Sequence, residues 1–240
     1  AALIQAYDAN GVICDDELSP AQLNNLEQEL ECKVMDRTMV ILDIFAQRAK
    51  TSEGKIQVEL AQLKYRAARL VGMRASLSRL GGGIGTRGPG EKKLEMDRRL
   101  IHSRIGQLKE QLEQVQKHRE LIRSQRDKSQ VKVAAIVGYT NAGKSTLLNT
   151  MTQAGVLEEN QLFATLDPTT RALDLPGKQQ ILLTDTVGFI RKLPHHLIEA
   201  FKSTLEEAKY ADMILHVVDA SNPQMDEHMQ VVYDTLRQLG

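Results

Sequence analysis

The sequence predicts an α/β protein with three consecutive parts: a small α/β segment, a long antiparallel helical hairpin, and an α/β domain with a parallel-rich sheet. Two observations predict this arrangement. In the middle part, apolar residues recur at alternating intervals of four and three in two separate stretches, which is typical of paired helices. In the last part, apolar strands alternate with helical stretches, which is typical of a doubly wound domain.

Residues 1–47 form the first part, which we expect to be an incomplete α/β domain. Ser19 and Pro20 match an N-cap followed by a proline at the first helical position, so a helix is expected from Pro20 to about Glu31. The stretch CKVMD is expected to form a short strand, and Asp36 is expected to cap a helix over RTMVILDIFAQRA. Nothing in this part indicates catalysis.

Residues 48–130 form the second part, a helical hairpin with a glycine-rich tip at residues 81–90. Its first apolar stripe is interrupted by Arg74 and its second by Arg119. The stripes consist of Ile56, Leu60, Leu63, Ala67, Leu70 and Leu77, and of Ile101, Ile105, Leu108, Leu112, Val115 and Ile122. A second arm from Glu91 to Lys128 would be about 55 Å long. We therefore expect the hairpin to project, with its outer faces and its tip in solvent.

Residues 131–240 form the third part, a domain that we expect to be incomplete at its C-terminal end. VKVAAIVG is a continuous apolar strand of the kind found in parallel sheets, and the helix KSTLLNTMTQAG follows it after a glycine loop. A strand pair (TRALDL and QQILLTD), a helix (HLIEAFKSTLEEAKYA), a third apolar strand (MILHVVD) and a last helix complete the pattern.

Charge is distributed unevenly along a chain whose formal net charge is zero. Residues 1–47 carry 2 basic and 9 acidic side chains, residues 48–132 carry 21 and 9, and residues 133–240 carry 8 and 13. The basic middle part fits either a surface that binds a polyanion such as RNA or DNA, or a solvated helical face. With no Trp and few aromatic residues, a stacking platform for single strands is not indicated.

Cys14 and Cys32 have neither metal-ligand nor redox-motif spacing, so they are expected to be reduced thiols of a cytoplasmic protein. No apolar run approaches the roughly 20 residues needed to span a membrane. No signal peptide is recognisable either.

The motif with the clearest chemistry is GYTNAGKS, which follows an apolar strand and opens a helix. Its glycines let backbone N–H groups turn inward around phosphates, and the N-terminus of the helix adds its dipole. Lys144 would reach the β- and γ-phosphates, and the Ser145 hydroxyl would ligate Mg²⁺. The nucleotide-binding residues expected here are Gly138, Tyr139, Thr140, Asn141, Ala142, Gly143, Lys144, Ser145 and Thr146.

Two later stretches complete a nucleotide site. Asp185 ends an apolar strand and begins Asp-Thr-Val-Gly, so its carboxylate would join the Mg²⁺ shell and the N–H of Gly188 would approach the γ-phosphate. Between the two motifs lies FATLDPTTR, residues 163–171, which we call the switch segment. A switch needs one Thr hydroxyl on the metal when the γ-phosphate is present, and Thr165, Thr169 and Thr170 are all candidates by their chemistry.

The tip of the hairpin contains a second glycine pattern, Gly83-x-Gly85-x-x-Gly88, with the spacing of a dinucleotide fingerprint. It lacks the context of that fingerprint, because no apolar strand precedes it and no acidic ribose partner follows it. Missing side chains would instead allow close approach to RNA, and a flexible turn is the alternative. The RNA-binding residues expected at and behind this tip are Arg79, Gly82, Gly83, Gly85, Arg87, Gly88, Lys92, Lys93, Arg98 and Arg99.

These stretches together resemble a known family. GYTNAGKSTLLN, FATLDPTTR, DTVGFIRKLP and LHVVDAS, with GTRGPGEKKLEMDRR upstream, are similar to the bacterial HflX family of ribosome-associated GTPases. The resemblance covers essentially the whole chain and implies a P-loop GTPase domain that binds GTP, GDP and Mg²⁺, with catalytic roles for Lys144, Thr165 and Gly188. It favours Thr165 over Thr169 as the metal ligand. It also implies binding to the rRNA of the large ribosomal subunit and the splitting or rescue of stalled or stress-inactivated ribosomes.

Three features qualify this resemblance. The Asn-Lys-x-Asp motif that recognises guanine is expected after the helix ending near Leu239, so a preference for GTP rests on the resemblance and on Thr186 following Asp185. Phe189 replaces a water-positioning Gln, so we expect slow intrinsic hydrolysis that the ribosome stimulates. Asn141 matches the asparagine of GTPases that recruit K⁺, and a residue that simply tolerates a tight loop is the alternative.

Two other functions remain open at this point: an RNA-remodelling ATPase with the same phosphate loop, and a coiled coil whose protein partner is chosen by the nucleotide. The protein is expected to be a monomer.

Overall fold

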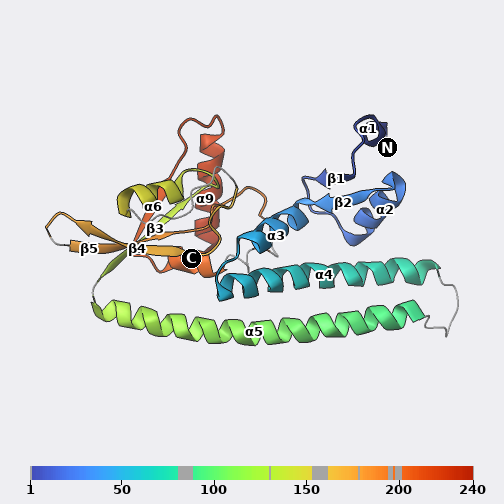
Figure 1. The fold of residues 1–240 in the computed structure, drawn as a ribbon, viewed down its shortest axis with the longest axis horizontal. Helices are drawn as coiled ribbons and strands as arrows, with labels where there is room; N and C mark the ends of the chain where they lie inside the picture. The colour runs from blue at the N-terminus through green and yellow to red at the C-terminus, as the bar shows by residue number, and fades with distance from the viewer. Residues whose placement is uncertain are drawn as a thin grey trace.

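The computed structural model describes residues 2–80, 89–129, 131–152, 162–177, 179–193, 197 and 202–239. Figure 1 shows the three parts of the chain: a small N-terminal α/β unit, two long helices side by side, and a sheet flanked by helices. The long helices run beneath the other two parts, and the second of them leads directly into the sheet. Among the described residues, no helix is long and apolar enough to cross a membrane.

The N-terminal unit consists of α1 (Ala2–Ala6), β1 (Gly11–Cys14), α2 (Pro20–Leu30), β2 (Lys33–Asp36) and α3 (Arg37–Arg48). β1 and β2 pair in parallel, from Gly11 opposite Lys33 to Cys14 opposite Asp36, and α2 forms the crossover between them. The helix begins at Pro20 because Ser19 forms a reciprocal capping box with Gln22. The predicted helix start, the short strand and the Asp36 cap are all confirmed.

The hairpin consists of α4 (Ser52–Leu80) and α5 (Pro89–Ser129). Leu60, Ile105 and Leu108 are buried between the two helices. Other members of the predicted stripes pack around them: Ile56, Leu63, Ala67, Ile101 and Leu112. The helical pair is therefore confirmed, although α5 begins at Pro89 rather than at Glu91 because proline is favoured at the first helical position.

The expectation that the outer faces of the hairpin lie in solvent is wrong for α4. Val58, Ala61 and Tyr65 form a second buried stripe on this helix, which packs on Ile41, Leu42 and Phe45 of α3. Figure 1 accordingly shows α2 and α3 on one side of α4 and α5 on the other. The sequence does not reveal the second stripe because its residues are interspersed with polar ones, whereas the stripe that faces α5 has regular spacing.

The third part is a four-stranded sheet in the order β4-β5-β3-β6. Its elements are β3 (Lys132–Gly138), α6 (Lys144–Thr152), β4 (Thr169–Leu175), β5 (Gln179–Asp185), α8 (Lys202–Lys209), β6 (Met213–Val217) and α9 (Met225–Leu239). β3 is parallel to β5 and β6, and β4 is antiparallel to β5. The predicted strands and the parallel-rich sheet are thus confirmed.

The side chains of β3 alternate between two cores. Ala134 and Ile136 pack with Leu148 of α6 on one face of the sheet. Ala135 and Val137 belong to the other core, with Leu205 of α8 and Val232 of α9. Helices therefore cover both faces of the sheet, as a doubly wound domain requires.

The second of these cores continues into the N-terminal unit. Phe163, from the switch segment, meets Phe45 of α3 edge-on, with ring centroids 4.9 Å apart and an interplanar angle of 84°. Both rings are buried, and Leu166 of the switch segment lies in the same cluster. Edge-to-face aromatic pairs stabilise a contact beyond the apolar area that they bury. The switch segment is therefore packed between the sheet and α3.

The arginine that interrupts the second stripe of the hairpin has partners outside it. Arg119 of α5 lies 3.0 Å from a carboxylate oxygen of Glu53 on α4 and 3.6 Å from one of Glu206 on α8. All three side chains are mostly buried. Charge therefore replaces apolar packing where the hairpin meets the sheet domain.

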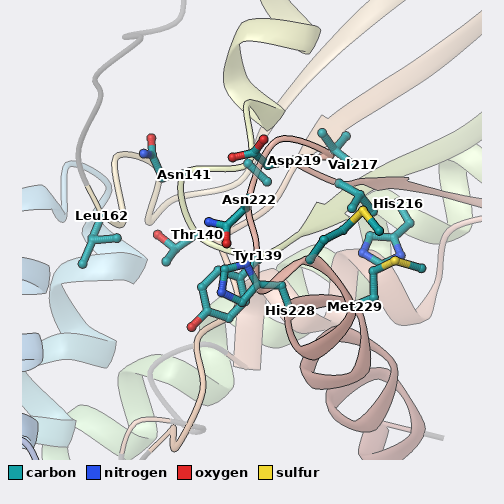
Figure 2. Close-up of a pocket in the computed structure, with 13 residues that line it drawn as sticks. Tyr139, Thr140, Asn141, Leu162, His216, Val217, Asp219, Asn222, His228 and Met229 are labelled. Atoms are coloured by element: carbon teal, nitrogen blue, oxygen red, sulfur yellow. The ribbon is translucent and has the colours of Figure 1, made fainter.

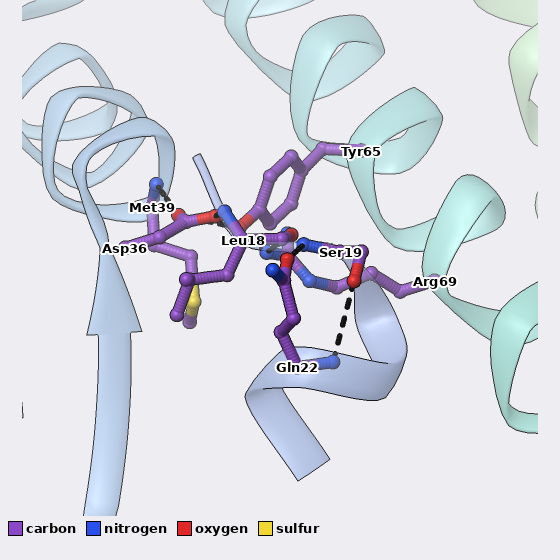
Figure 3. Close-up of polar contacts among 7 residues, drawn as sticks. All are labelled: Leu18, Ser19, Gln22, Asp36, Met39, Tyr65 and Arg69. Carbon is purple, nitrogen blue, oxygen red and sulfur yellow. Dashed lines mark hydrogen bonds and ion pairs between the residues drawn. The ribbon is translucent and has the colours of Figure 1, made fainter. Parts of the chain in front are cut away.

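A buried carboxylate joins the N-terminal unit to α4 (Figure 3). Asp36 is fully buried and accepts hydrogen bonds from the N–H groups of Leu18 and Met39. From α4, the Tyr65 hydroxyl and the Arg69 guanidinium each donate to it at 2.6 Å. The guanidinium carbon of Arg69 also lies 3.5 Å from the centre of the Tyr65 ring. One carboxylate thus holds β2, α3 and α4 together.

Replacing Asp36 with asparagine should lower the free energy of unfolding by about 3–5 kcal/mol, because Arg69 would stay buried without a counter-charge. Urea titration of the two proteins measures this difference. Asp43→Asn on the exposed side of α3 is the control, and it should change stability by less than about 0.5 kcal/mol. A loss for Asp36→Asn no greater than that of the control would contradict the prediction.

Candidate functional site

The loop between β3 and α6 has the geometry of a phosphate-binding loop. Asn141 and Gly143 take left-handed conformations, with φ of 62° and 90°, and α6 begins at Lys144. A Cβ on Gly138 would lie 2.3 Å from the carbonyl oxygen of Val217 on β6, so only glycine fits there. The loop therefore turns sharply at the carboxyl edge of the sheet and presents the N-terminus of α6.

Lys144 is buried at the start of α6, and its Nζ donates to the carbonyl oxygen of Tyr139 at 2.9 Å. Burial lowers the pKa of this ammonium to about 8, and the nearby Asp185 carboxylate opposes the shift. A phosphate beside Nζ would favour the charged form in the same way as a carboxylate does. The Tyr139 carbonyl therefore holds the lysine inside the loop, where its ammonium could contact an anion bound in the loop.

Three oxygen-bearing side chains meet beside this lysine. The Ser145 hydroxyl donates to Oδ2 of Asp185 at 2.7 Å, and the Thr165 hydroxyl donates to the same oxygen at 2.9 Å. The two hydroxyl oxygens are themselves 2.9 Å apart. We call Ser145, Thr165 and Asp185 the oxygen cluster.

The oxygen cluster fits a magnesium ion. Mg²⁺ prefers hydroxyl, carboxylate and water oxygens, and these three side chains supply the first two kinds. Oδ1 of Asp185 is buried and has no hydrogen-bond partner among the described residues. Burial raises the pKa of the Asp185 carboxyl, whereas the Ser145 hydroxyl, the Lys144 ammonium and the Thr165 hydroxyl lower it. A cation would compensate both the orphaned oxygen and the buried charge.

The other threonines of the switch segment lie elsewhere. Thr169 begins β4 and is the strand partner of Asp185 in the antiparallel ladder. The hydroxyl of Thr170 is 2.8 Å from that of Thr184 on β5. The structure therefore brings Thr165, and neither of the other two, into the oxygen cluster.

Gly188 lies close to the phosphate-binding loop. A Cβ at this position would be 2.5 Å from Cα of Thr140 and 3.0 Å from Nζ of Lys144. The next residue, Phe189, forms a small parallel bridge with Tyr139, in which Thr140 N–H donates to the Phe189 carbonyl at 2.7 Å and Phe189 N–H donates to the Gly138 carbonyl at 3.0 Å. The Phe189 side chain is buried in the core. The segment after Asp185 is thus fixed to the loop through its backbone.

One pocket lies directly at these groups. It is lined by Thr140, Asn141, Gly143, Lys144, Ser145, Thr146, Phe163, Ala164, Thr165, Thr186 and Gly188. Six of the predicted nucleotide-binding residues therefore share one opening with Thr165. The predicted residues Gly138, Tyr139, Ala142 and Asp185 do not line it.

A second pocket of about 190 Å³ shares Thr140 and Asn141 and extends to β6 and α9 (Figure 2). The ring of Tyr139 stacks on His228 of α9 with centroids 3.6 Å apart, and the Tyr139 hydroxyl accepts a hydrogen bond from Arg191 N–H at 3.3 Å. Tyr139 therefore links the loop to α9 and to the segment after Gly188. This pocket is larger, but neither Lys144 nor the oxygen cluster lines it, so the first pocket offers more groups that could bind phosphates.

The sequence does not predict the contacts that Thr140, Phe163 and Asp167 make near the site. The Thr140 hydroxyl accepts a hydrogen bond from Phe163 N–H at 3.0 Å, and Phe163 takes a left-handed φ of 54°. Asp167 reaches out of the site to the start of α4. These contacts join residues far apart in sequence, and only the adjacency of Phe163 and Asp167 to Thr165 gave a signal.

The proposed RNA-binding residues are described only in part. Arg98 and Arg99 are exposed on α5, and Arg99 pairs with Glu95 one turn earlier at 3.2 Å. Arg79 lies on α4 and Lys92 and Lys93 lie on α5, as backbone positions near the tip. Gly82, Gly83, Gly85, Arg87 and Gly88 lie outside the described residues.

Comparisons with known proteins match the three parts in order. The family described as "GTP-binding GTPase N-terminal" matches residues 1–46, and "GTP-binding GTPase Middle Region" matches residues 48–126. The family described as "50S ribosome-binding GTPase" matches residues 133–239. A solved structure of a GTP-binding protein from the archaeon Sulfolobus solfataricus, in complex with GDP, is similar with a TM-score of 0.50 and 28% identity. The match covers 100% of this chain and 64% of that chain.

Several relatives carry the name GTPase HflX, and two of them illustrate the range of identity. The protein from Lacrimispora saccharolytica is 80% identical over 237 residues, which are 99% of this chain and 56% of the relative. The protein from Escherichia coli is 53% identical over 239 residues, which are 100% of this chain and 56% of the relative. The chain thus spans little more than half the length of these relatives. Because the likeness extends through all three parts and includes the phosphate-binding loop, this chain belongs to the HflX family of GTPases.

Proposed function

We propose that the protein is a Mg²⁺-dependent GTPase that uses the bound nucleotide as a switch and acts on the large ribosomal subunit. The observation that carries the first half is the oxygen cluster of Ser145, Thr165 and Asp185 beside Lys144. The preference for guanine and the large subunit rest on the family, whose matching description for residues 133–239 is a 50S ribosome-binding GTPase.

Each group of the site has a role in this proposal. The N–H groups of the loop and of the first turn of α6 surround the phosphates, and Lys144 leaves the Tyr139 carbonyl to contact the β- and γ-phosphates. Ser145, Thr165 and Asp185 would hold Mg²⁺, which would supply positive charge to offset that of the phosphates. Gly188 offers its N–H to the γ-phosphate without a side chain in the way. Asn141 is the residue through which K⁺ would join the site.

Phe189 bears on the rate of hydrolysis. Its side chain is buried in the core, and an apolar ring cannot orient an attacking water. Slow hydrolysis in the isolated protein is therefore expected, with the missing group supplied or ordered by the ribosome. A long-lived GTP state suits a factor that must find its target before it is released.

The hairpin is the proposed contact with rRNA. Arg98 and Arg99 lie exposed on α5 near the tip, in the strongly basic middle part of the chain. Guanidinium groups on one helix contact phosphates without reading sequence, while the glycine-rich tip would reach rRNA and compete with contacts between the subunits. Splitting or rescue of stalled ribosomes is the outcome that we propose for this contact.

Replacing Thr165 with alanine should weaken the Mg²⁺-dependent binding of a non-hydrolysable GTP analogue about tenfold, because one charge-assisted contact to the metal is lost. GDP binding should not change, since the switch threonine joins the metal only with a γ-phosphate present. Thr169→Ala removes another threonine considered as the metal ligand. It is the matched control and should behave as the wild type. Equal effects of the two substitutions on analogue binding, by calorimetry, would contradict the assignment.

Nucleotide affinity should depend on pH through Lys144. Its pKa of about 8 in the free protein would rise beside phosphates, so binding takes up a proton above pH 8 and is independent of this group below it. The affinity should therefore fall as pH rises through the pKa, by at most about tenfold per pH unit. Equilibrium binding of GDP across this range measures the effect. Lys144→Met should bind weakly and lose the dependence, whereas a flat wild-type profile would contradict the prediction.

Binding to ribosomal subunits tests the second half of the proposal. Co-sedimentation with separated subunits should recover the protein with the large subunit, more strongly with a non-hydrolysable GTP analogue than with GDP. The double substitution of Arg98 and Arg99 by glutamate should weaken this binding about tenfold and reduce its salt dependence. The control is the same charge change at exposed Arg171 and Arg237 of the sheet domain. Binding to the small subunit alone would overturn the claim that the protein acts on the large subunit. Unchanged binding after substitution of Arg98 and Arg99 would overturn the claim that these residues contact rRNA.

A further inference from the structure

Asp167, two residues after Thr165, contacts Lys50 and Thr51, the two residues just before α4, rather than the nucleotide pocket. Its Oδ2 accepts hydrogen bonds from the N–H groups of Lys50 and Thr51 at 2.8 and 2.9 Å. The Thr51 hydroxyl donates to Oδ1 and also accepts from Gly54 N–H at 2.9 Å, as an N-cap residue does. A side chain of the switch segment thus completes the N-terminal cap of a hairpin helix.

Gly54 shows that the helix is adapted to this side chain. A Cβ at position 54 would lie 2.2 Å from Oδ1 of Asp167, so any other residue would displace the carboxylate. Glycine inside a helix costs roughly 1 kcal/mol relative to alanine. α4 therefore contains an unfavourable helix residue at the point where Asp167 needs room. By contrast, a Cβ on Gly106, in the middle of α5, would meet nothing within 4 Å.

The same turn of α4 joins the rest of the hairpin. Glu53, beside Gly54, pairs with Arg119 of α5, and Arg119 also pairs with Glu206 of α8. Burial raises the pKa of Glu53; Arg119 opposes this, and the neighbouring carboxylates Glu206, Asp167 and Glu207 add to it. Asp167 therefore enters a turn that already holds acidic charge, and the N–H groups at the start of the helix favour its carboxylate there.

The backbone couples Thr165 to Asp167. Two residues of chain span at most about 7 Å, and Leu166 between them is buried in the core with Phe163 and Phe45. If the backbone at Thr165 moves away from the oxygen cluster, it displaces Leu166 and Asp167 as well. The presence of a γ-phosphate at the metal would therefore be felt at the first turn of α4.

We propose that Asp167 is a detachable cap of α4 that transmits the nucleotide state from Thr165 to the helical hairpin. With GTP and Mg²⁺, Thr165 is held in the oxygen cluster and Asp167 caps α4, which fixes the base of the hairpin. With GDP, Thr165 no longer binds the metal. Asp167 then detaches from α4, and the base of the hairpin loosens. Asp167 is a positioning residue in this scheme, and the proposal rests on the proposed GTP switch.

Reciprocity follows from this coupling. If the γ-phosphate favours the capped state, the cap must favour the γ-phosphate by the same factor. Asp167→Asn should therefore weaken binding of a GTP analogue about fivefold or more and leave GDP binding unchanged, although Asp167 lies outside the nucleotide pocket. Asparagine keeps the shape of the side chain and loses only the charge, so the protein should fold normally.

Hydrogen exchange of the full chain tests the proposal without ribosomes, with GDP or a non-hydrolysable GTP analogue bound. The readout is a peptide that covers residues 50–54. Asp167 accepts from the N–H groups of Lys50 and Thr51, and the Gly54 N–H donates to the Thr51 hydroxyl, which Asp167 holds in place. Wild-type exchange there should be about fivefold or more slower with the analogue than with GDP. Asp167→Asn and Gly54→Ala should both abolish the difference. Gly106→Ala, also a helical glycine replaced by alanine, should retain it.

The outcomes separate this proposal from the one before it. Binding of both nucleotides with equal exchange at residues 50–54 would overturn the cap and leave the GTPase proposal intact. A wild-type difference that persists in Asp167→Asn would also overturn it. Failure to bind either nucleotide would overturn both proposals. Absence of ribosome binding would overturn only the ribosomal half of the proposed function, since the exchange assay contains no ribosomes.

Discussion

The burial of Phe163 against Phe45 is the contact on which the arrangement of this protein depends. It places an aromatic residue of the switch segment in a core shared with α3 and α4, so the segment is part of the connection between the sheet domain and the other two parts. In most enzymes a loop that must move is bound weakly to its surroundings. Here the loop is packed on both sides, and its motion necessarily disturbs the interface. Packed interfaces tend to have discrete alternative arrangements, which suits a switch.

The elements that could be predicted from sequence are those set by local rules. The caps at Ser19 and Asp36, the two seams of the hairpin, and the strand, glycine loop and helix around Gly138–Ser145 each follow from residues close together in the chain. The phosphate-binding loop is predictable because its geometry needs glycine at fixed positions and a lysine at the helix start. The choice of Thr165 over Thr169 came from family resemblance, because three threonines in one polar loop are equivalent by composition.

The features that could not be predicted are long-range. The sequence does not predict that α4 has two buried faces. The stripe that pairs with α5 already explains the spacing of its apolar residues, so Val58, Ala61 and Tyr65 form no separate pattern. In the sequence, Arg119 only interrupts the second apolar stripe of the hairpin. The fold shows that it pairs with Glu53 and Glu206. Asp167 and Gly54 are 113 residues apart, and each is unremarkable alone. In this protein, the charged residues and the glycine that break a local pattern lie at contacts between the parts of the chain.

The length of α5 has a mechanical consequence. This helix of 41 residues begins beside the glycine-rich tip and ends just before β3, the strand in the middle of the sheet. At 1.5 Å per residue it forms a rod of about 60 Å, so a rotation of about 5° at the sheet end would move the far end by about 5 Å. A small rotation of the sheet domain would therefore be a displacement as large as an amino-acid side chain at the distant end of this helix.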